Sequence, residues 1–144
     1  MALRSLVAAA CVGLLLVSCD APTGHEVVGD VTLLRQAHPA DTYPAGMGLG
    51  TLVVQNGCVG VEGPDGVAYV VWMPGTELRE GSSGMEVVVG DESAQMGESI
   101  QIGGGYGDLA WVEGLTTGGI PEGCRASGAQ SYFLHGGGLA HATP

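Results

Sequence analysis

Short runs of β-branched residues, separated by residues that favour tight turns, are the feature that most constrains the fold of this chain. The sequence LGTLVVQNGCVGVEG places Asn56-Gly57 between two such runs, and this pattern is a strong β-hairpin signal. A Pro-Asp-Gly turn at 64–66 then leads into a run that we expect to be a strand at 67–73. Pro74-Gly75 ends that strand.

Runs of the same kind continue along the chain. We expect further strands within residues 84–91, 98–105, 107–114 and 131–135, and we find no helical pattern of convincing length. Closely spaced short strands with turn signals between them are typical of small barrels and sandwiches. The sequence therefore predicts an all-β fold, either a small six- to seven-stranded OB-like β-barrel or a sandwich.

The N-terminus has the pattern of an export signal. Arg4 precedes an uncharged stretch at 6–17, which is too short to span a membrane as a helix. Leu16-Val17-Ser18-Cys19 resembles the bacterial lipobox. The resemblance implies diacylglycerol on the Cys19 sulfur, cleavage before Cys19 and acylation of the new amino group. Cys11 is a weaker candidate for this role, and the remaining alternative is a secreted protein in which Cys19 is incidental.

These observations predict a division of the chain into four parts. Residues 1–18 would be a lipoprotein-type signal peptide, 19–46 a flexible tether, 47–137 the β-barrel domain and 138–144 a disordered tail. Within the tether, the segment 26–35 could form a helix or a strand. Two or more acyl chains hold a protein stably on a membrane. The expected location is the extracytoplasmic side of the cell membrane, and whether this is an inner or an outer membrane stays open.

Two cysteines remain after export and lipidation. Cys58 and Cys124 form an even pair in an oxidising compartment, so we expect a disulfide between them. Such a bridge would stabilise the domain by about 4 kcal/mol on a chain-entropy estimate. A metal site built on the two thiols is the alternative, but it lacks third and fourth ligands nearby in the sequence.

Charge excludes some partners. The chain has 15 acidic and only 4 basic residues, for a formal net charge of −11. A surface this acidic repels phosphate backbones, so nucleic acid is not an expected partner. No basic patch is available to bind anionic lipids.

Several segments together resemble a group of small bacterial secreted or lipid-anchored β domains of unassigned function. The segments that carry the resemblance are residues 50–54, Gly57-Cys58, 71–75, 97–104, 120–124 and Tyr132-Phe133. In that group the aromatic pair follows the second cysteine closely, whereas here seven residues intervene. The resemblance implies a barrel and a disulfide, and it implies no catalytic residues.

Four aromatic residues are the candidate ligand contacts: Tyr69, Trp72, Tyr106 and Trp111. Aromatic side chains exposed on one face of a barrel can stack on sugars or bases, and the acidic charge favours a sugar or a peptide over nucleic acid. Core packing is the alternative, because both faces of the 67–73 strand are apolar.

Residues for other chemistries are present without a recognisable motif. Asp91, Glu92, Glu98 and Asp108 supply oxygen atoms for Ca²⁺, and the methionines and histidines supply ligands for copper, but neither set has metal-binding spacing. Ser82-Ser83 is not part of a G-x-S-x-G nucleophile motif. We therefore predict no catalytic residue, no metal ligand and no cofactor.

The resulting expectation is a membrane-anchored lipoprotein that acts as a non-catalytic binding module in the cell envelope. Its partner would be an envelope protein or glycan. Two alternatives stay open, a metal-binding envelope protein for calcium or copper and a small envelope hydrolase.

Overall fold

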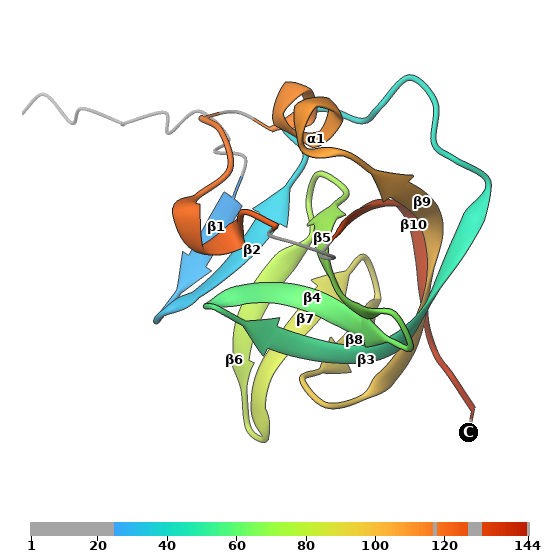
Figure 1. Cartoon of the computed structure of the whole chain (residues 1–144). Helices are drawn as coiled ribbons and strands as arrows, with labels where there is room; N and C mark the ends of the chain where they lie inside the picture. The colour runs from blue at the N-terminus through green and yellow to red at the C-terminus, as the bar shows by residue number, and fades with distance from the viewer. Residues whose placement is uncertain (1–24, 117, 127–130, 144) are drawn as a thin grey trace, which may run out of the picture.

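The computed structural model describes residues 25–116, 118–126 and 131–143, and these residues form a mostly β structure (Figure 1). The strands are β1 (His25–Val28), β2 (Val31–Arg35), β3 (Gly46–Gln55), β4 (Cys58–Gly63), β5 (Gly66–Trp72), β6 (Glu77–Gly81), β7 (Gly84–Val89), β8 (Glu92–Gln95), β9 (Ser99–Gly107) and β10 (Ser131–His141). A short helix, α1 (Leu109–Leu115), and a 3₁₀ turn, η1 (Glu122–Cys124), lie between β9 and β10. The predicted all-β class is confirmed.

The strands form two sheets of unequal size. The larger one has the order β1-β2-β4-β3-β9-β10-β5, and β5 also pairs with β4 and β2, so this sheet is curled. The smaller sheet is the meander β6-β7-β8. The molecule is not a single closed barrel, because β1 extends the sheet beyond β2 and the meander stands apart from it. It also has more strands than the predicted six or seven, because β1, β2, β6 and β8 were not predicted.

The two predicted turns are confirmed. Gln55 pairs with Cys58 across Asn56 and Gly57, which have φ angles of 53° and 76°. Positive φ at both central residues is the geometry of a type I′ turn, whose twist matches that of the flanking strands. The β4–β5 hairpin turns through Pro64 and Asp65.

The predicted tether is wrong at residues 25–35, and the predicted tail is wrong at 138–141. Residues 25–35 form β1 and β2, and β2 pairs in parallel with β4 and β5. Leu33 and Leu34 on β2 are fully buried, one in each of the two core clusters. At the other end, β10 continues to His141, so residues 138–141 belong to the sheet. The signal peptide and Cys19 lie outside the described residues.

The predicted strand at 107–114 is a helix instead. Asp108 is the N-cap of α1, and its Oδ1 accepts a hydrogen bond from the Trp111 N–H at 2.8 Å. Val112 is the buried residue of the helix and packs in the same cluster as Leu109 and Leu115. The spacing of these three apolar residues favours one buried helical face over strand alternation.

Strand β5 separates two hydrophobic clusters. Val70 and Trp72 point into the cluster between the two sheets, whereas Tyr69 and Val71 point into the cluster beneath α1 and η1. Both faces of this strand are therefore buried in the core. Core packing was the alternative expected from the sequence, because both faces of the strand are apolar.

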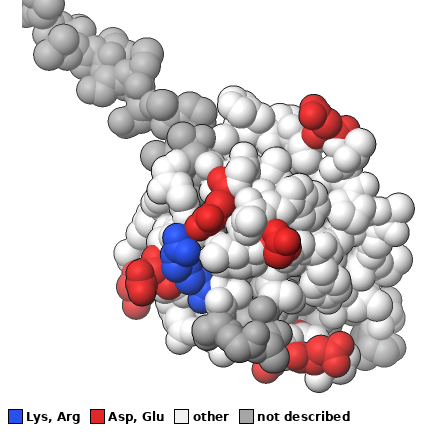
Figure 2. All heavy atoms as spheres, turned by 45° about the horizontal axis from the view of Figure 1, so that its top comes forward, with Lys and Arg blue, Asp and Glu red and all other residues white. Residues whose placement is uncertain are grey.

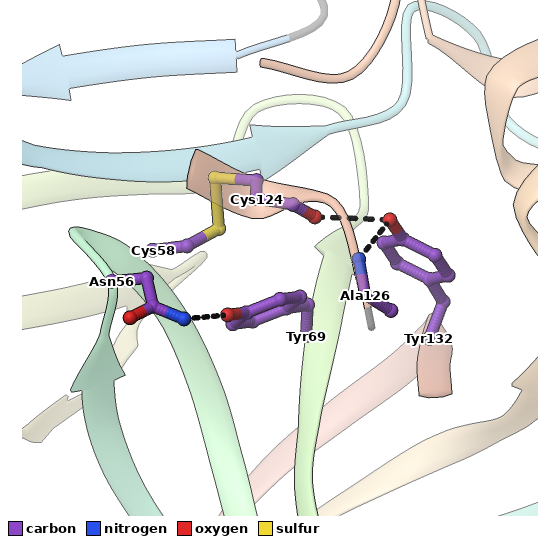
Figure 3. Close-up of a disulfide and its surroundings, with 6 residues drawn as sticks. All are labelled: Asn56, Cys58, Tyr69, Cys124, Ala126 and Tyr132. Atoms are coloured by element: carbon purple, nitrogen blue, oxygen red, sulfur yellow. Dashed lines mark hydrogen bonds between the residues drawn. A yellow bond between two sulfur atoms is a disulfide. The ribbon is translucent and has the colours of Figure 1, made fainter. Parts of the chain in front are cut away.

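The predicted disulfide joins Cys58 on β4 to Cys124 in η1, with Cα atoms 5.3 Å apart (Figure 3). The Tyr132 hydroxyl donates to the Cys124 carbonyl at 3.0 Å and accepts from the Ala126 N–H at 2.8 Å. These contacts hold η1 and Ala126 against the sheet.

Candidate functional site

An apolar pocket of about 310 Å³ opens beside the β4–β5 turn. It is lined by β3, the β4–β5 hairpin, β9 and the first part of β10. The lining residues are Gly48, Leu49, Val61, Gly63, Pro64, Asp65, Gly66, Val67, Ala68, Ile102, Tyr106, Ser131 and Phe133. We call this site the central pocket. Its volume is at the lower end of the range for small-ligand sites, which are typically concave and mostly apolar.

Tyr106 is the most exposed large apolar side chain among the described residues, with 65% of its surface accessible. Its ring stands edge-on to the buried ring of Phe133, with the centroids 5.2 Å apart. Aromatic pairs favour this arrangement. Phe133 therefore supports an exposed aromatic wall at the pocket.

The pocket depends on a residue without a side chain in β3. A Cβ atom on Gly48 would lie 3.1 Å from the Phe133 ring and 3.2 Å from Ile102. Because glycine has no Cβ atom, the Phe133 ring can pack directly against β3 at this position. The adjacent Leu49 is 54% exposed and adds an apolar side chain to the rim.

Two shallower hollows adjoin the central pocket. The α1-side hollow shares Tyr106 and Ser131 with it and continues to Asp108 and Leu109. The C-terminal hollow shares Leu49, Gly63 and Pro64 with it and continues to Glu62 and Ala142. The three depressions therefore lie side by side on one surface.

Acidic side chains are the charged groups along this surface. Glu62, Asp65 and Asp108 each line one of the three depressions, and no arginine lines any of them. The three arginines of the described chain are all ion-paired elsewhere: Arg35 with Glu26 at 3.0 Å, Arg79 with Glu77 at 2.8 Å and Arg125 with Glu113 at 2.9 Å. On the face shown in Figure 2, the basic side chains occupy one small area and have acidic neighbours.

The structure separates the four predicted aromatic contacts. Tyr69 and Trp72 are fully buried in the core, so neither is a surface contact, and their prediction as contacts is wrong. The Tyr69 hydroxyl accepts from Asn56 Nδ2 at 3.1 Å (Figure 3). Trp111 is half-buried on α1 and packs against the cluster that contains Val112. Tyr106 alone of the four lines the central pocket.

Sequence reasoning missed Leu49 and Phe133 as pocket residues. Both lie in apolar strands and look like core residues in the sequence. A signal for the site was present in the alternating glycines of 46–50, because a strand that lacks side chains on one face leaves room for a close neighbour. That neighbour, Phe133, comes from the other end of the chain.

A buried polar cluster lies away from the pocket, around His135. Burial lowers the pKa of His135 below its ordinary value of 6.5, and the hydrogen bond to the Gly138 carbonyl opposes this effect. Gln36 Nε2 donates to the carbonyls of Val71 and His135, and the Tyr43 hydroxyl donates to Gln36 Oε1. These bonds tie the chain after β2 to β5 and β10.

Burial also raises the pKa of Tyr132, whose hydroxyl already makes the two hydrogen bonds beside the disulfide. The third shifted group is Arg79, whose pKa is raised by its hydrogen bond and ion pair with Glu77. None of these three groups lines the central pocket.

The carboxylates considered for calcium are not gathered into a metal site among the described residues. Within residues 25–116, 118–126 and 131–143, no group of three His, Cys, Asp or Glu side chains is arranged to hold a metal ion. Glu98 accepts from the Gln95 N–H and contacts His141, and Asp108 caps α1. Among the same residues, no helix is long and apolar enough to cross a membrane.

Comparisons with known proteins give no relative for this chain: no family model, no curated protein and no solved structure matches it. The resemblance to small bacterial envelope domains therefore stays a prediction from the quoted segments.

Proposed function

We propose that this protein is a membrane-anchored lipoprotein that binds an apolar group of an envelope partner and catalyses no reaction. The observation that carries the proposal is the central pocket, where an exposed tyrosine stands over a buried phenylalanine. Exposed clusters of large apolar side chains on a small protein mark interaction sites. The anchor at Cys19 rests on the lipobox resemblance.

The polar groups of the pocket favour binding over catalysis. Its polar side-chain groups are the Asp65 carboxylate and the hydroxyls of Ser131 and Tyr106, and no histidine, cysteine or lysine lines it. A nucleophilic serine needs an adjacent general base that is itself oriented by a third group. The buried imidazole of His135 makes its hydrogen bonds within its own cluster. No observation favours the metal-binding or hydrolase alternative specifically.

The binding proposal is tested by thermal unfolding of the full chain in mild detergent, with cell-wall fragments, oligosaccharides, apolar peptides, Ca²⁺ and Cu²⁺ as probes. A ligand at 100 times its dissociation constant adds about 2.7 kcal/mol to the free energy of unfolding. We expect a stabilising probe among the organic compounds, and we expect Tyr106→Ala to abolish its effect.

Val54→Ser is the matched control. Val54 lies on β3 and is exposed, as Tyr106 is, but it lies outside all three depressions. A stabilisation that Tyr106→Ala leaves unchanged would contradict the proposed site. Stabilisation by a metal ion alone would favour the metal-binding alternative. Incorporation of labelled palmitate that is lost in Cys19→Ser and kept in Cys11→Ser would support the anchor.

A further inference from the structure

The central pocket adjoins both hollows, and we call the three depressions together the groove. Tyr106 and Ser131 belong to both the central pocket and the α1-side hollow. Leu49 and Pro64 belong to both the central pocket and the C-terminal hollow. Each shared residue is a wall with an accessible hollow on both sides, so a single chain-like ligand can lie across all three depressions.

The groove has an apolar centre and carboxylates along its rim. Val61, Ile102 and Phe133 supply the apolar lining of the central pocket. Glu62, Asp65 and Asp108 add one carboxylate to each depression, and all three are exposed. Within the described chain, neither Glu62 nor Asp65 forms a salt bridge. One carboxylate oxygen of Asp108 accepts the hydrogen bond that caps α1.

Charge complementarity then defines the ligand. A negatively charged ligand would meet three carboxylates and no cation in this groove, in a chain whose net charge is −11. A cation on either side of an apolar group would instead meet a carboxylate in each hollow. Complementary potentials of this kind set partner choice and association rate.

We propose that the groove binds an extended basic polypeptide segment that inserts one apolar side chain into the central pocket, with lysine or arginine side chains on both sides of it. A polypeptide fits better than a sugar chain because the pocket floor is made of aliphatic and aromatic side chains. Sugar recognition needs several polar side chains directed at the hydroxyl groups. This proposal rests on the proposed function and specifies its partner.

The test is isothermal titration calorimetry on the full chain in a non-ionic detergent. The probe is an end-blocked nonapeptide, Ser-Lys-Ser-Lys-Leu-Lys-Ser-Lys-Ser. Two companion peptides replace the four lysines by glutamate or the leucine by glycine, and chitohexaose serves as a neutral sugar probe. We expect the lysine–leucine peptide to bind, each replacement to weaken binding at least tenfold, and added salt to weaken it as well.

Charge-neutral variants locate the interaction on the protein. Glu62→Gln, Asp65→Asn and Asp108→Asn are combined in one protein, and asparagine preserves the helix cap at 108. The matched control combines Glu80→Gln, Asp91→Asn and Glu92→Gln, which removes the same charge from exposed positions on and beside the β6-β7-β8 sheet. We expect about a tenfold weaker affinity for the groove variant, because each exposed ion pair contributes a few-fold at most. The control variant should stay within twofold of the wild type.

The outcomes separate this proposal from the proposed function. Equal weakening in both triple variants would mean general attraction to an acidic protein and would overturn the basic-segment proposal. Binding of chitohexaose that Tyr106→Ala abolishes, without peptide binding, would overturn it too and would leave the binding module intact with a glycan as ligand. An absence of heat with the lysine–leucine peptide at millimolar concentration would also overturn it.

Discussion

His135 lies fully buried within β10, which continues past the end of the predicted 131–135 strand. Its Nε2 lies 2.9 Å from the Gly138 carbonyl and its Nδ1 3.5 Å from the Met73 nitrogen, so the neutral ring with a proton on Nε2 satisfies both contacts. The ring also stacks edge-on against Trp72, with centroids 5.0 Å apart.

The lowered pKa of His135 predicts a loss of stability in acid. In the unfolded chain this histidine takes up a proton near its ordinary pKa of 6.5, whereas the folded protein keeps it neutral to lower pH. The unfolded state therefore binds more protons below pH 6.5, and the free energy of unfolding falls as the pH drops from 6.5 through the lowered pKa. Urea unfolding of the wild type at pH 7.5 and pH 5.5 measures this change.

His135→Gln isolates the contribution of this one group. At pH 7.5 we expect the variant to be less stable by about 1–3 kcal/mol, because it loses a buried hydrogen bond and the ring contact. The difference in free energy of unfolding between the wild type and the variant should be smaller at pH 5.5, since glutamine does not titrate. The other histidines and the carboxylates are common to both proteins. A difference that stays constant between the two pH values would contradict the assignment.

Irregular pairing between β9 and β10 bends these two strands. The register between these strands shifts twice, between His135 and Gly137 and between Gly137 and Leu139. Such irregularities bend and twist a strand. Opposite them, Gly104 has a φ of 145°, and a Cβ atom placed there would overlap the Leu134 carbonyl.

Two glycine-to-alanine substitutions should therefore have opposite effects. We expect Gly104→Ala to lower the free energy of unfolding by about 3 kcal/mol, because it combines backbone strain with overlap of the adjacent strand. Gly114→Ala in α1, where a Cβ would meet no atom within 4 Å, should raise it by about 0.5–1 kcal/mol. Urea unfolding of both variants gives the comparison. An unchanged free energy of unfolding in Gly104→Ala would show that β9 and β10 can separate at this point without loss of stability.

The Asn56-Gly57 hairpin and strand β2 show why one element could be predicted from the sequence and another could not. The Asn56-Gly57 hairpin depends on its own turn and was predicted correctly. Strand β2 is stabilised by parallel pairing with β4 and β5, which no local pattern encodes. Helix α1 had a usable signal in the capping Asp108 and the apolar residues spaced three apart after it, but its short length made strand and helix hard to distinguish.

At the scale of the molecule, the pocket shows where prediction from sequence stops. Tyr106 was among the predicted contacts, yet the pocket needs β3, the β4–β5 turn, β9 and β10 together. Tyr69 and Trp72 are aromatic strand residues, as Tyr106 is, and their burial separates them from it. Burial is a property of the assembled fold, since it depends on which strands cover each face.

The disulfide gives the last prediction, because it connects the sheet to the excursion between β9 and β10. Cys58 and Cys124 are 66 residues apart, and closing a loop of this length restricts the unfolded chain by about 4 kcal/mol. The double variant Cys58→Ala, Cys124→Ala should lose at least this much stability, since both side chains are buried and alanine leaves space behind. Thermal unfolding should show a decrease in Tm of roughly 15 °C.

The same double variant tests whether the bridge shapes the groove. The excursion contains α1, whose capping Asp108 and adjoining Leu109 line the α1-side hollow. If the bridge holds α1 in place, reduction of the wild type and the double variant should both lower the free energy of unfolding, the variant more because alanine leaves space, and both should increase amide exchange within α1. If instead α1 stays protected and the loss of stability is below about 1 kcal/mol, packing of Val112 against the β5 and β10 side chains is sufficient to hold the excursion, and the groove does not depend on the redox state of the compartment.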